Sequence, residues 1–336
     1  MRRQAMTDFG ISVLGLDADA EVRRISDGIR KYLSIHKRRG VVVAMSGGID
    51  SSVVAALCAA AVTKDRVLGL LLPERESSAD TLRLSRLAAD TLRIRSVVED
   101  ITPMLDSAGC YRRRNEAIRL VYPELDERCA VKITLPGLLE GNSLRLFSII
   151  IRTADGREIK RRLTPESYLG IVAASNFKQR IRTMLAYYYA DRMNYVVAGT
   201  PNRLEYDQGF FVKQGDGTAD IKPIAHLYKS QVYQLAGVLN IPLEIRTRPP
   251  TTDTYSLPQS QEEFFFSLPY EKMDLCLYGK NHHIPEREVA VAAGISIEQV
   301  KKIFQDIDQK RKTTAYLHHS SALIETVSEV SSAEYL

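Results

Sequence analysis

One stretch of the sequence constrains the fold more than any other, an apolar run that ends in a Gly-Gly turn and then resumes as an alanine-rich run. The first run covers residues 41–45, the turn covers 46–52 and the second run covers 53–61. A short apolar run that stops at glycines is typical of a buried strand, and a longer apolar run behind it favours a helix. The sequence therefore predicts a strand, a tight turn and a helix in succession.

The residues of this turn suit a phosphate group. Gly47 and Gly48 let the backbone adopt positive φ and approach an anion closely, and the helix N-terminus adds free N–H groups. Hydroxyl donors come from Ser46, Ser51 and Ser52. Asp50 would repel a phosphate unless a divalent cation lies between them, so its presence indicates Mg²⁺ and pyrophosphate together. An ordinary strand-to-helix turn is the alternative, since Gly and Ser are common there.

The spacing of the turn excludes two familiar phosphate loops. A Walker loop needs a lysine after its last glycine, and a dinucleotide loop needs G-x-G-x-x-G. The string S-G-G-x-D-S at residues 46–51 instead resembles the pyrophosphate loop of the N-type ATP pyrophosphatases. That resemblance implies cleavage of ATP between its α- and β-phosphates to adenylate an acceptor. The resemblance of this loop does not indicate which acceptor is adenylated.

Composition limits where the protein works. A net charge of +5 suits anionic nucleotides and nucleic acid equally, so it does not discriminate between them. Four cysteines without a C-x-x-C pair favour reduced thiols over a disulfide framework or a zinc ribbon. We found no apolar run of membrane length and no signal sequence. We therefore expect a soluble, cytoplasmic protein without a membrane or nucleic-acid partner.

Strands and helices alternate along the chain. Further strands are predicted at 67–72, 94–98 and 195–200, and helices at 20–35, 78–92, 179–192, 228–239, 270–277, 286–293 and 296–311. This alternation predicts an α/β fold with a doubly wound, mainly parallel sheet flanked by helices and a ligand at the carboxyl ends of its strands. We expect one domain over residues 1–336, with an insertion at about 120–168 and a C-terminal extension at about 316–336.

The middle of the chain narrows the resemblance. The patterns G-T-x-x-x-x-E, G-F-F-x-K and G-D-G-x-A-D-x-x-P stand at 199–205, 209–213 and 215–223. Together with N-F-K-Q-R at 176–180 and P-T-T-D at 250–253, they closely resemble the ammonia-dependent NAD synthetases. The resemblance covers most of residues 20–315 and implies the adenine nucleotide alpha-hydrolase-like fold. Near the end Gln309 replaces the histidine of the family's H-K-R pattern.

The resemblance implies an ATP-dependent amide ligase that converts deamido-NAD, ammonia and ATP to NAD, AMP and pyrophosphate through an acyl-adenylate. It assigns catalysis to Asp50, Glu205 and Lys229, with Asp50 and Glu205 as Mg²⁺ ligands. The implied ATP-binding residues are Ser46, Gly47, Gly48, Asp50, Ser51, Ser52, Ser78, Thr200, Lys229 and Thr251. For Glu205 the alternative is a solvated surface carboxylate, and for Ser78 a simple helix N-cap.

The acceptor side follows from the same resemblance. The residues implied to bind deamido-NAD are Asn176, Arg180, Tyr187, Phe210, Lys213 and Asp216. For Tyr187, packing in the core is the alternative. The resemblance also implies a homodimer, and the chain is too short to add a nitrilase-type glutaminase, so ammonia would arrive free or from a separate partner. The pairs at 282–283 and 318–319 are adjacent histidines, which favours surface positions over a metal site.

One block departs from the family. Alternating β-branched residues around Ala154, Asp155 and Gly156 predict a β-hairpin at 144–160. This inserted hairpin could reshape the acceptor pocket, cover it, mediate assembly or be a passive surface insertion. The C-terminal extension lacks the family's Pro-rich ending. Two other functions therefore stay open: a related ATP pyrophosphatase that amidates a different carboxylate, and a non-catalytic nucleotide-binding descendant.

Overall fold

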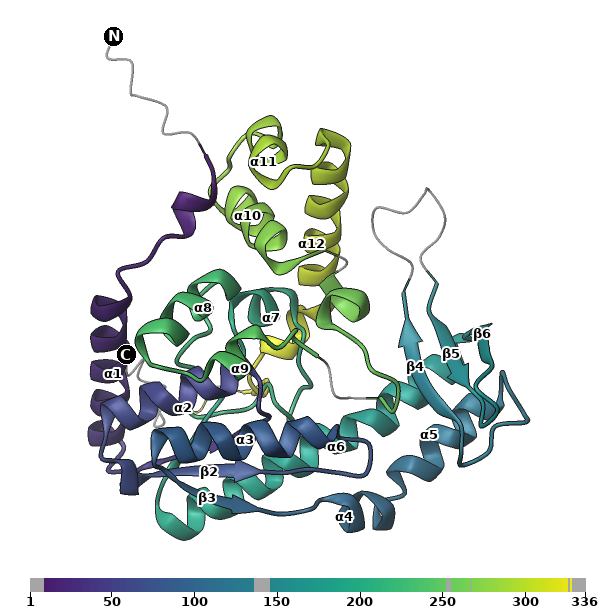
Figure 1. Cartoon of the computed structure of the whole chain (residues 1–336), viewed down its shortest axis with the longest axis horizontal. Coiled ribbons are helices and arrows are strands. Elements are labelled where there is room, and N and C mark those ends of the chain that lie inside the picture. The colour runs from purple at the N-terminus through teal and green to yellow at the C-terminus, as the bar shows by residue number, and fades with distance from the viewer. Residues whose placement is uncertain (1–8, 136–145, 252–254, 267, 326, 328–336) are drawn as a thin grey trace.

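A four-stranded parallel sheet organises the fold, and two of its strands are labelled in the lower part of Figure 1. The computed structural model describes residues 9–135, 146–251, 255–266, 268–325 and 327. The strand order is β3-β2-β1-β7, with every neighbouring pair parallel. The bounds are β1 Val41–Ala44, β2 Val67–Leu71, β3 Arg95–Val98 and β7 Val196–Ala198. The predicted doubly wound α/β sheet is therefore confirmed.

Helices cover both faces of this sheet because its central strand is buried on both sides. Val41 and Val43 pack in a core shared with α1, α2, α3 and α8, whereas Val42 packs in a second core with α4 and α6. The helices are α1 Ala18–Ile35, α2 Ile49–Ala61, α3 Ala79–Leu92, α4 Thr102–Ser107, α6 Pro165–Met193 and α8 Lys229–Val238. A continuous apolar run such as β1 is what a two-sided parallel strand requires.

The helix α6 is longer than predicted. Its second half matches the expected helix at 179–192, but the helix begins at Pro165, where the Thr164 side chain accepts a hydrogen bond from Ser167 N at 3.1 Å. Small residues in the first half hid its helical pattern. At Gly170 an added Cβ would lie 2.7 Å from the Ala117 Cβ, so glycine permits close packing against α5, Cys110–Arg119.

A second, antiparallel sheet precedes α6. It pairs β5, Ser148–Arg152, with β6, Glu158–Arg162, through a turn in which Gly156 has φ 84°. The predicted hairpin is thus confirmed, although residues 144–145 of it lie outside the described residues. The structure adds β4, Ala130–Thr134, which pairs with β5 and was not predicted. We call these three strands the inserted sheet.

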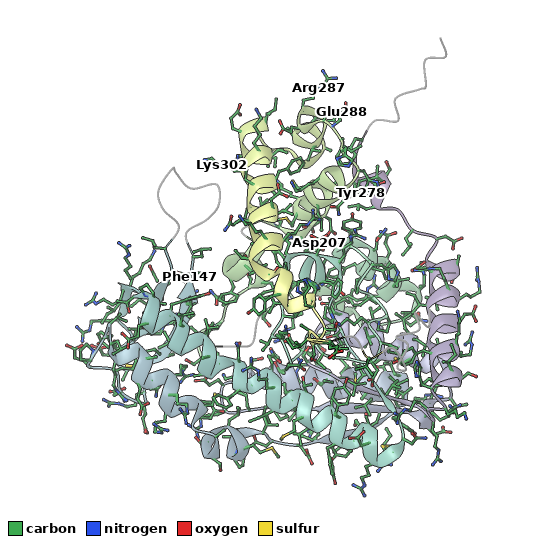
Figure 2. The ribbon with its side chains drawn as sticks, turned by 180° about the vertical axis from the view of Figure 1, so that it is seen from behind. Phe147, Asp207, Tyr278, Arg287, Glu288 and Lys302 are labelled. Carbon is green, nitrogen blue, oxygen red and sulfur yellow. The ribbon has the colours of Figure 1, made fainter. Side chains whose placement is uncertain are left out.

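A helical unit lies above the parallel sheet in Figure 1. It comprises α10 Tyr270–Asn281, α11 Glu286–Ala293 and α12 Ile297–His318 around its own apolar core. Arg311 of α12 forms an ion pair of 2.6 Å with Asp207, which is labelled in Figure 2 and lies in the connection that precedes this unit in the sequence. The helix α12 extends seven residues past the expected end at Arg311, so it continues into the predicted C-terminal extension at about 316–336.

The remaining elements are short connections. They are the 3-10 helices Ile11–Leu14 and Lys64–Arg66, α7 Arg203–Gln208, α9 Leu243–Thr247 and the π-helical turn Glu262–Phe266. Among the described residues, no helix combines the length and apolarity that crossing a bilayer would require.

Candidate active site

The Gly-Gly turn joins β1 to α2 at the carboxyl edge of the parallel sheet. Gly47 has φ 72°, and Gly48 is the N-cap of α2. The hydroxyls of Ser51 and Ser52 are buried and donate to the Gly48 carbonyl at 3.1 and 2.9 Å. Ser46 is exposed. The strand, turn and helix predicted from the sequence are confirmed.

Replacing Gly47 with alanine should destabilise the fold and weaken ATP binding. An added Cβ would lie 2.7 Å from the Thr81 carbonyl oxygen, and the left-handed backbone disfavours any side chain. We expect the free energy of unfolding to fall by about 2 kcal/mol. Urea unfolding and the KM for ATP, which should rise, would measure both effects. Gly28→Ala in α1, where a Cβ meets nothing within 4 Å, is the control and should not destabilise.

Three charged side chains meet beside the turn. The Lys229 ammonium forms an ion pair with the Asp50 carboxylate, and the Asn202 side-chain amide donates to Asp50 Oδ1 at 3.1 Å. Asn202 is also the N-cap of α7, whose third residue is Glu205. The structure therefore brings Asp50, Glu205 and Lys229 together from three segments that are far apart in the sequence.

Glu205 is not a solvated surface carboxylate. Its Oε2 accepts from the Asn202 backbone N–H at 3.1 Å, and its Oε1 accepts from Gln261 Nε2 at 3.0 Å. Burial, together with the nearby charge of Asp50, raises the pKa of Glu205 to about 8. Two carboxylates that share one lysine leave a local excess of negative charge, which a divalent cation would neutralise.

Lys229 is held at the start of α8. Its side chain is only 2% exposed, and burial alone would lower its pKa, but Asp50 and Glu205 raise the pKa instead. The buried carboxylate of Asp274 accepts from the Lys229 and Ser230 backbone N–H groups at 3.2 and 2.7 Å. Asp274 therefore caps α8 and fixes the position of the lysine.

Three supporting residues were not predicted as part of the site, namely Asn202, Gln261 and Asp274. The sequence does carry a signal for Asn202, because N-x-x-E at 202–205 is a capping-box pattern that includes the predicted metal ligand Glu205. Nothing near Gln261 or Asp274 in the sequence indicates contact with residues 45 or more positions away.

A pocket of about 850 Å³ lies between the loop after β2, α5, the inserted sheet and the segment that ends at Gln259. Ser78 and Thr251 both line it, so the structure brings these two predicted ATP-binding residues to one cavity. Ser78 is also the N-cap of α3, and its hydroxyl accepts from Arg248 Nη2 at 3.2 Å. Thr200 is half-buried between β7 and α7.

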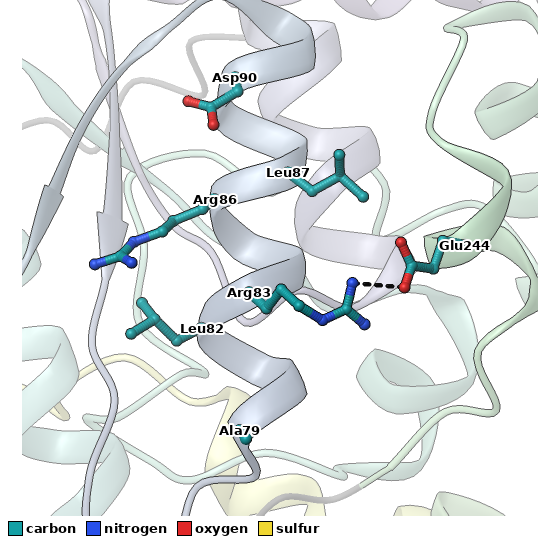
Figure 3. Close-up of a pocket in the computed structure, with 7 residues that line it drawn as sticks. All are labelled: Ala79, Leu82, Arg83, Arg86, Leu87, Asp90 and Glu244. Atoms are coloured by element: carbon teal, nitrogen blue, oxygen red, sulfur yellow. Dashed lines mark ion pairs between the residues drawn. The ribbon is translucent and has the colours of Figure 1, made fainter.

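A smaller pocket of about 440 Å³ runs along α3 (Figure 3). Arg83 bridges it to Glu244 of α9 at 2.6 Å, and the exposed Asp90 stands at its other end. None of the predicted site residues lines this pocket, so we do not assign it to the reaction.

Two of the charged residues predicted to bind the acceptor, Arg180 and Lys213, contact each other. Arg180 of α6 contacts the Lys213 carbonyl at 3.4 Å, and Lys213 Nζ donates to the Tyr316 carbonyl at 2.7 Å. Asp216 Oδ1 accepts from the Val212 backbone N–H at 2.8 Å. Asn176 lies one turn before Arg180 on the same face of α6.

The two predicted acceptor aromatics already have protein partners. Tyr187 is half-buried, and its hydroxyl contacts Asp220 at 3.4 Å. Phe210 stacks on Phe265 with ring centroids 4.6 Å apart, and both half-buried rings pack against the core of the helical unit. Phe211 instead meets His318 edge-on at 5.2 Å. A role of Tyr187 or Phe210 toward deamido-NAD stays a prediction.

The carboxylate oxygens of the site fit a magnesium ion that also binds phosphate oxygens. Among the described residues, no three His, Cys, Asp or Glu side chains cluster as a complete metal site. Asp50 and Glu205 supply two hard oxygen donors, and an octahedral ion would take its other ligands from phosphate oxygens and water.

Comparison with known proteins identifies the family of this chain. The model of the NAD synthase family matches residues 21–130 and 149–314, which is most of the chain. The chain belongs to the NAD synthase family. The unmatched residues 131–148 lie inside the predicted insertion at about 120–168, whereas the family model matches the rest of that range, including β6 and most of β5. Two relatives named NH(3)-dependent NAD(+) synthetase are similar to this chain, one from Mesorhizobium japonicum at 57% identity and one from Rhizobium meliloti at 53%. The alignments cover 91% and 96% of this chain, and 96% of each relative.

Two solved structures of related proteins share the fold. The NH3-dependent NAD synthetase from Campylobacter jejuni matches with a TM-score of 0.59 at 21% identity, over 92% of this chain and 100% of its own. The NMN synthetase from Francisella tularensis matches with a TM-score of 0.63 at 19% identity, over 92% and 99%. Because these two proteins carry different names on one architecture, the fold alone does not decide the acceptor.

Proposed function

We propose that this protein is an ATP-dependent amide ligase that converts deamido-NAD, ammonia and ATP to NAD, AMP and pyrophosphate. The observation that carries the proposal is the meeting of Asp50, Glu205 and Lys229 beside the Gly-Gly turn. A non-catalytic descendant would have no need to retain this costly group of buried charges.

The reaction proceeds in two steps. An oxygen of the nicotinate carboxylate attacks the α-phosphorus, the bond from that phosphorus to the β-bridging oxygen breaks, and pyrophosphate leaves. Ammonia then attacks the carbonyl carbon of the acyl-adenylate, loses a proton and expels AMP. The turn and Lys229 stabilise the departing pyrophosphate, and Asp50 and Glu205 would hold Mg²⁺, which supplies further charge neutralisation. Positioning of the two substrates supplies the remaining acceleration.

The acceptor site and a homodimer belong to the same proposal. Asn176, Arg180 and Lys213 supply polar and cationic groups for the dinucleotide, with Asp216, Tyr187 and Phe210 as further contacts. Leu169, Met184 and Tyr188 are exposed along α6, with side chains more than half accessible. A second copy of this chain would cover such an apolar stripe beside Arg180.

Free ammonia is the proposed nitrogen source. Cys58, Cys110 and Cys276 are buried, and burial raises the pKa of each thiol, to about 12 for Cys58 and Cys276 and to about 11 for Cys110. Such thiols are poor nucleophiles, so they do not suit a glutaminase. Reduced, buried cysteines also support a cytoplasmic location.

Magnesium binding should release a proton. At pH 7 Glu205 is mostly protonated because its pKa is about 8, and a metal ligand must be ionised. The affinity for Mg²⁺ with a non-hydrolysable ATP analogue should therefore rise with pH up to about 8 and then level off. Calorimetry at pH 7 in buffers of different ionisation enthalpy should show close to one proton released. Glu205→Gln should abolish that release, and equal release from both proteins would contradict the assignment.

The choice of acceptor can be tested with competing substrates. The protein is supplied with ATP, Mg²⁺ and ammonium, and with either deamido-NAD or nicotinate mononucleotide, and AMP formation is followed. We expect deamido-NAD to give AMP and NAD with the higher kcat/KM. AMP release with the mononucleotide alone would preserve the ATP chemistry and overturn the acceptor. AMP release with neither would favour a different carboxylate or a non-catalytic protein.

A further inference from the structure

A buried group of charges lies between α6, α5 and the loop after β2, away from the Asp50 site. We call it the charge cluster, and its members are Glu74, Glu76, Tyr111, Arg114 and Lys178. The Lys178 side chain is 2% exposed, and its Nζ lies 2.7 Å from Glu74 Oε1 and 2.6 Å from Glu76 Oε2. Arg114 Nη1 lies 2.6 Å from Glu76, and the Tyr111 hydroxyl donates to Glu74 Oε2 at 2.6 Å.

Stability alone does not explain the charge cluster. Its two carboxylates and two cations sum to zero net charge. The free-energy cost of burying four charges is about as large as the gain from their attraction. Apolar side chains of the same volume would pack the three segments equally well. The charges instead impose one geometry, because each group is satisfied only when the others are in place.

The geometry that they impose is that of the loop leading to Ser78. The Glu74 carboxylate that pairs with Lys178 also accepts the Glu76 backbone N–H at 3.0 Å. Ser77 closes the loop through bonds to Glu74 of 3.1 and 2.9 Å. Glu76, Ser77 and Ser78 then line the pocket of about 850 Å³.

Lys178 links this loop to the helix that carries the acceptor residues. Asn176 and Arg180 are four residues apart and share one face of α6, so Lys178 between them points to a different face, toward the loop. Lys178 is thus the α6 side chain that holds residues 74–76 of the loop, while Arg182 of the same 29-residue helix donates to the Leu72 carbonyl at 3.2 Å where the loop begins. A displacement of residues 74–76 is therefore transmitted through Lys178 to α6.

We propose that Lys178 is a positioning residue that couples the ATP-side loop to the acceptor helix, so that ATP and the acceptor each strengthen binding of the other. The inference rests on the proposed function, which places ATP at Ser78 and deamido-NAD at Asn176 and Arg180. Lys178 touches neither substrate; it holds the two binding segments in register.

Two variants of the full chain separate coupling from folding. Lys178→Met removes the link and leaves an unbalanced negative charge, whereas Glu74→Gln with Lys178→Met restores the charge balance without the link. The double variant should therefore recover most of the Tm lost in Lys178→Met. Lys280→Met is the control, since it removes a lysine that pairs with Asp308 at 2.8 Å in the helical unit.

The readout is the dissociation constant of deamido-NAD with and without Mg²⁺ and α,β-methylene-ATP. We expect the analogue to tighten binding at least about fivefold in the wild type and in Lys280→Met, and by less than about twofold in the double variant, where the Arg182 contact to Leu72 remains. Wild-type coupling in the double variant, or no coupling in the wild type, would overturn the proposal. If the wild type does not bind deamido-NAD, the acceptor assignment fails. The positioning role is then tested with the ATP analogue alone. The double variant should bind the analogue about tenfold more weakly than the wild type does, and equal binding would overturn the role.

Discussion

Replacing Asp50 with asparagine should lower kcat/KM for NAD formation by about a thousandfold or more, since it removes both a proposed metal ligand and the partner of Lys229. Asparagine keeps the shape of the side chain, and its oxygen can still accept the bond from Asn202. Circular dichroism should therefore show a folded protein.

The control for Asp50→Asn is Asp90→Asn. Asp90 is an exposed aspartate on α3 in the pocket of Figure 3, outside the proposed site. Steady-state kinetics with ATP, Mg²⁺, ammonium and deamido-NAD would compare the two. An Asp50→Asn enzyme with a tenth or more of wild-type activity would exclude Asp50 as a metal ligand.

Glu205→Gln should lower the activity and raise the thermal stability. We expect kcat to fall by about a hundredfold or more because the glutamine cannot neutralise a metal ion. We also expect Tm to rise by about 2 °C or more at pH 8.5, since the buried carboxylate no longer has to ionise there.

The sign of that stability change follows from the pKa of Glu205, which is about 8 in the folded protein against an ordinary 4.5. A carboxyl with a raised pKa contributes no penalty below pH 4.5, a growing one as pH rises toward 8 and a constant one above it. Thermal unfolding of both proteins at pH 5 and pH 8.5 would measure the difference. Glu244→Gln, at an exposed position on α9, should shift Tm little at either pH. A Tm for Glu205→Gln below that of the wild type at pH 8.5 would contradict the raised pKa.

The local parts of the fold and site were readable from the sequence. Gly47 and Gly48 identify the turn because only a glycine adopts φ 72° there without strain, and Asp50 inside that turn indicates a metal. The hairpin around Gly156 is local too, since its two strands are neighbours in sequence and the tight turn fixes their register.

The parts that depend on distant contacts were not readable. The strand β4 pairs with β5 across an intervening stretch of chain, and its five residues alone carry no pairing signal. Lys178 looks like a solvated helix residue until the fold buries it against Glu74, 104 positions away. Phe210 fits a substrate-stacking role by type, but the direction of its ring depends on the helical unit that the later sequence builds.

The most direct test of the central claim follows the carboxylate oxygen of the acceptor. The purified protein is given ATP, Mg²⁺, ammonium and deamido-NAD that carries ¹⁸O in both oxygens of its nicotinate carboxylate. If that carboxylate attacks the α-phosphorus and ammonia then expels AMP, mass spectrometry will find one ¹⁸O atom in each AMP formed and one in each NAD. Unlabelled AMP, or label in inorganic phosphate together with ADP, would contradict an acyl-adenylate.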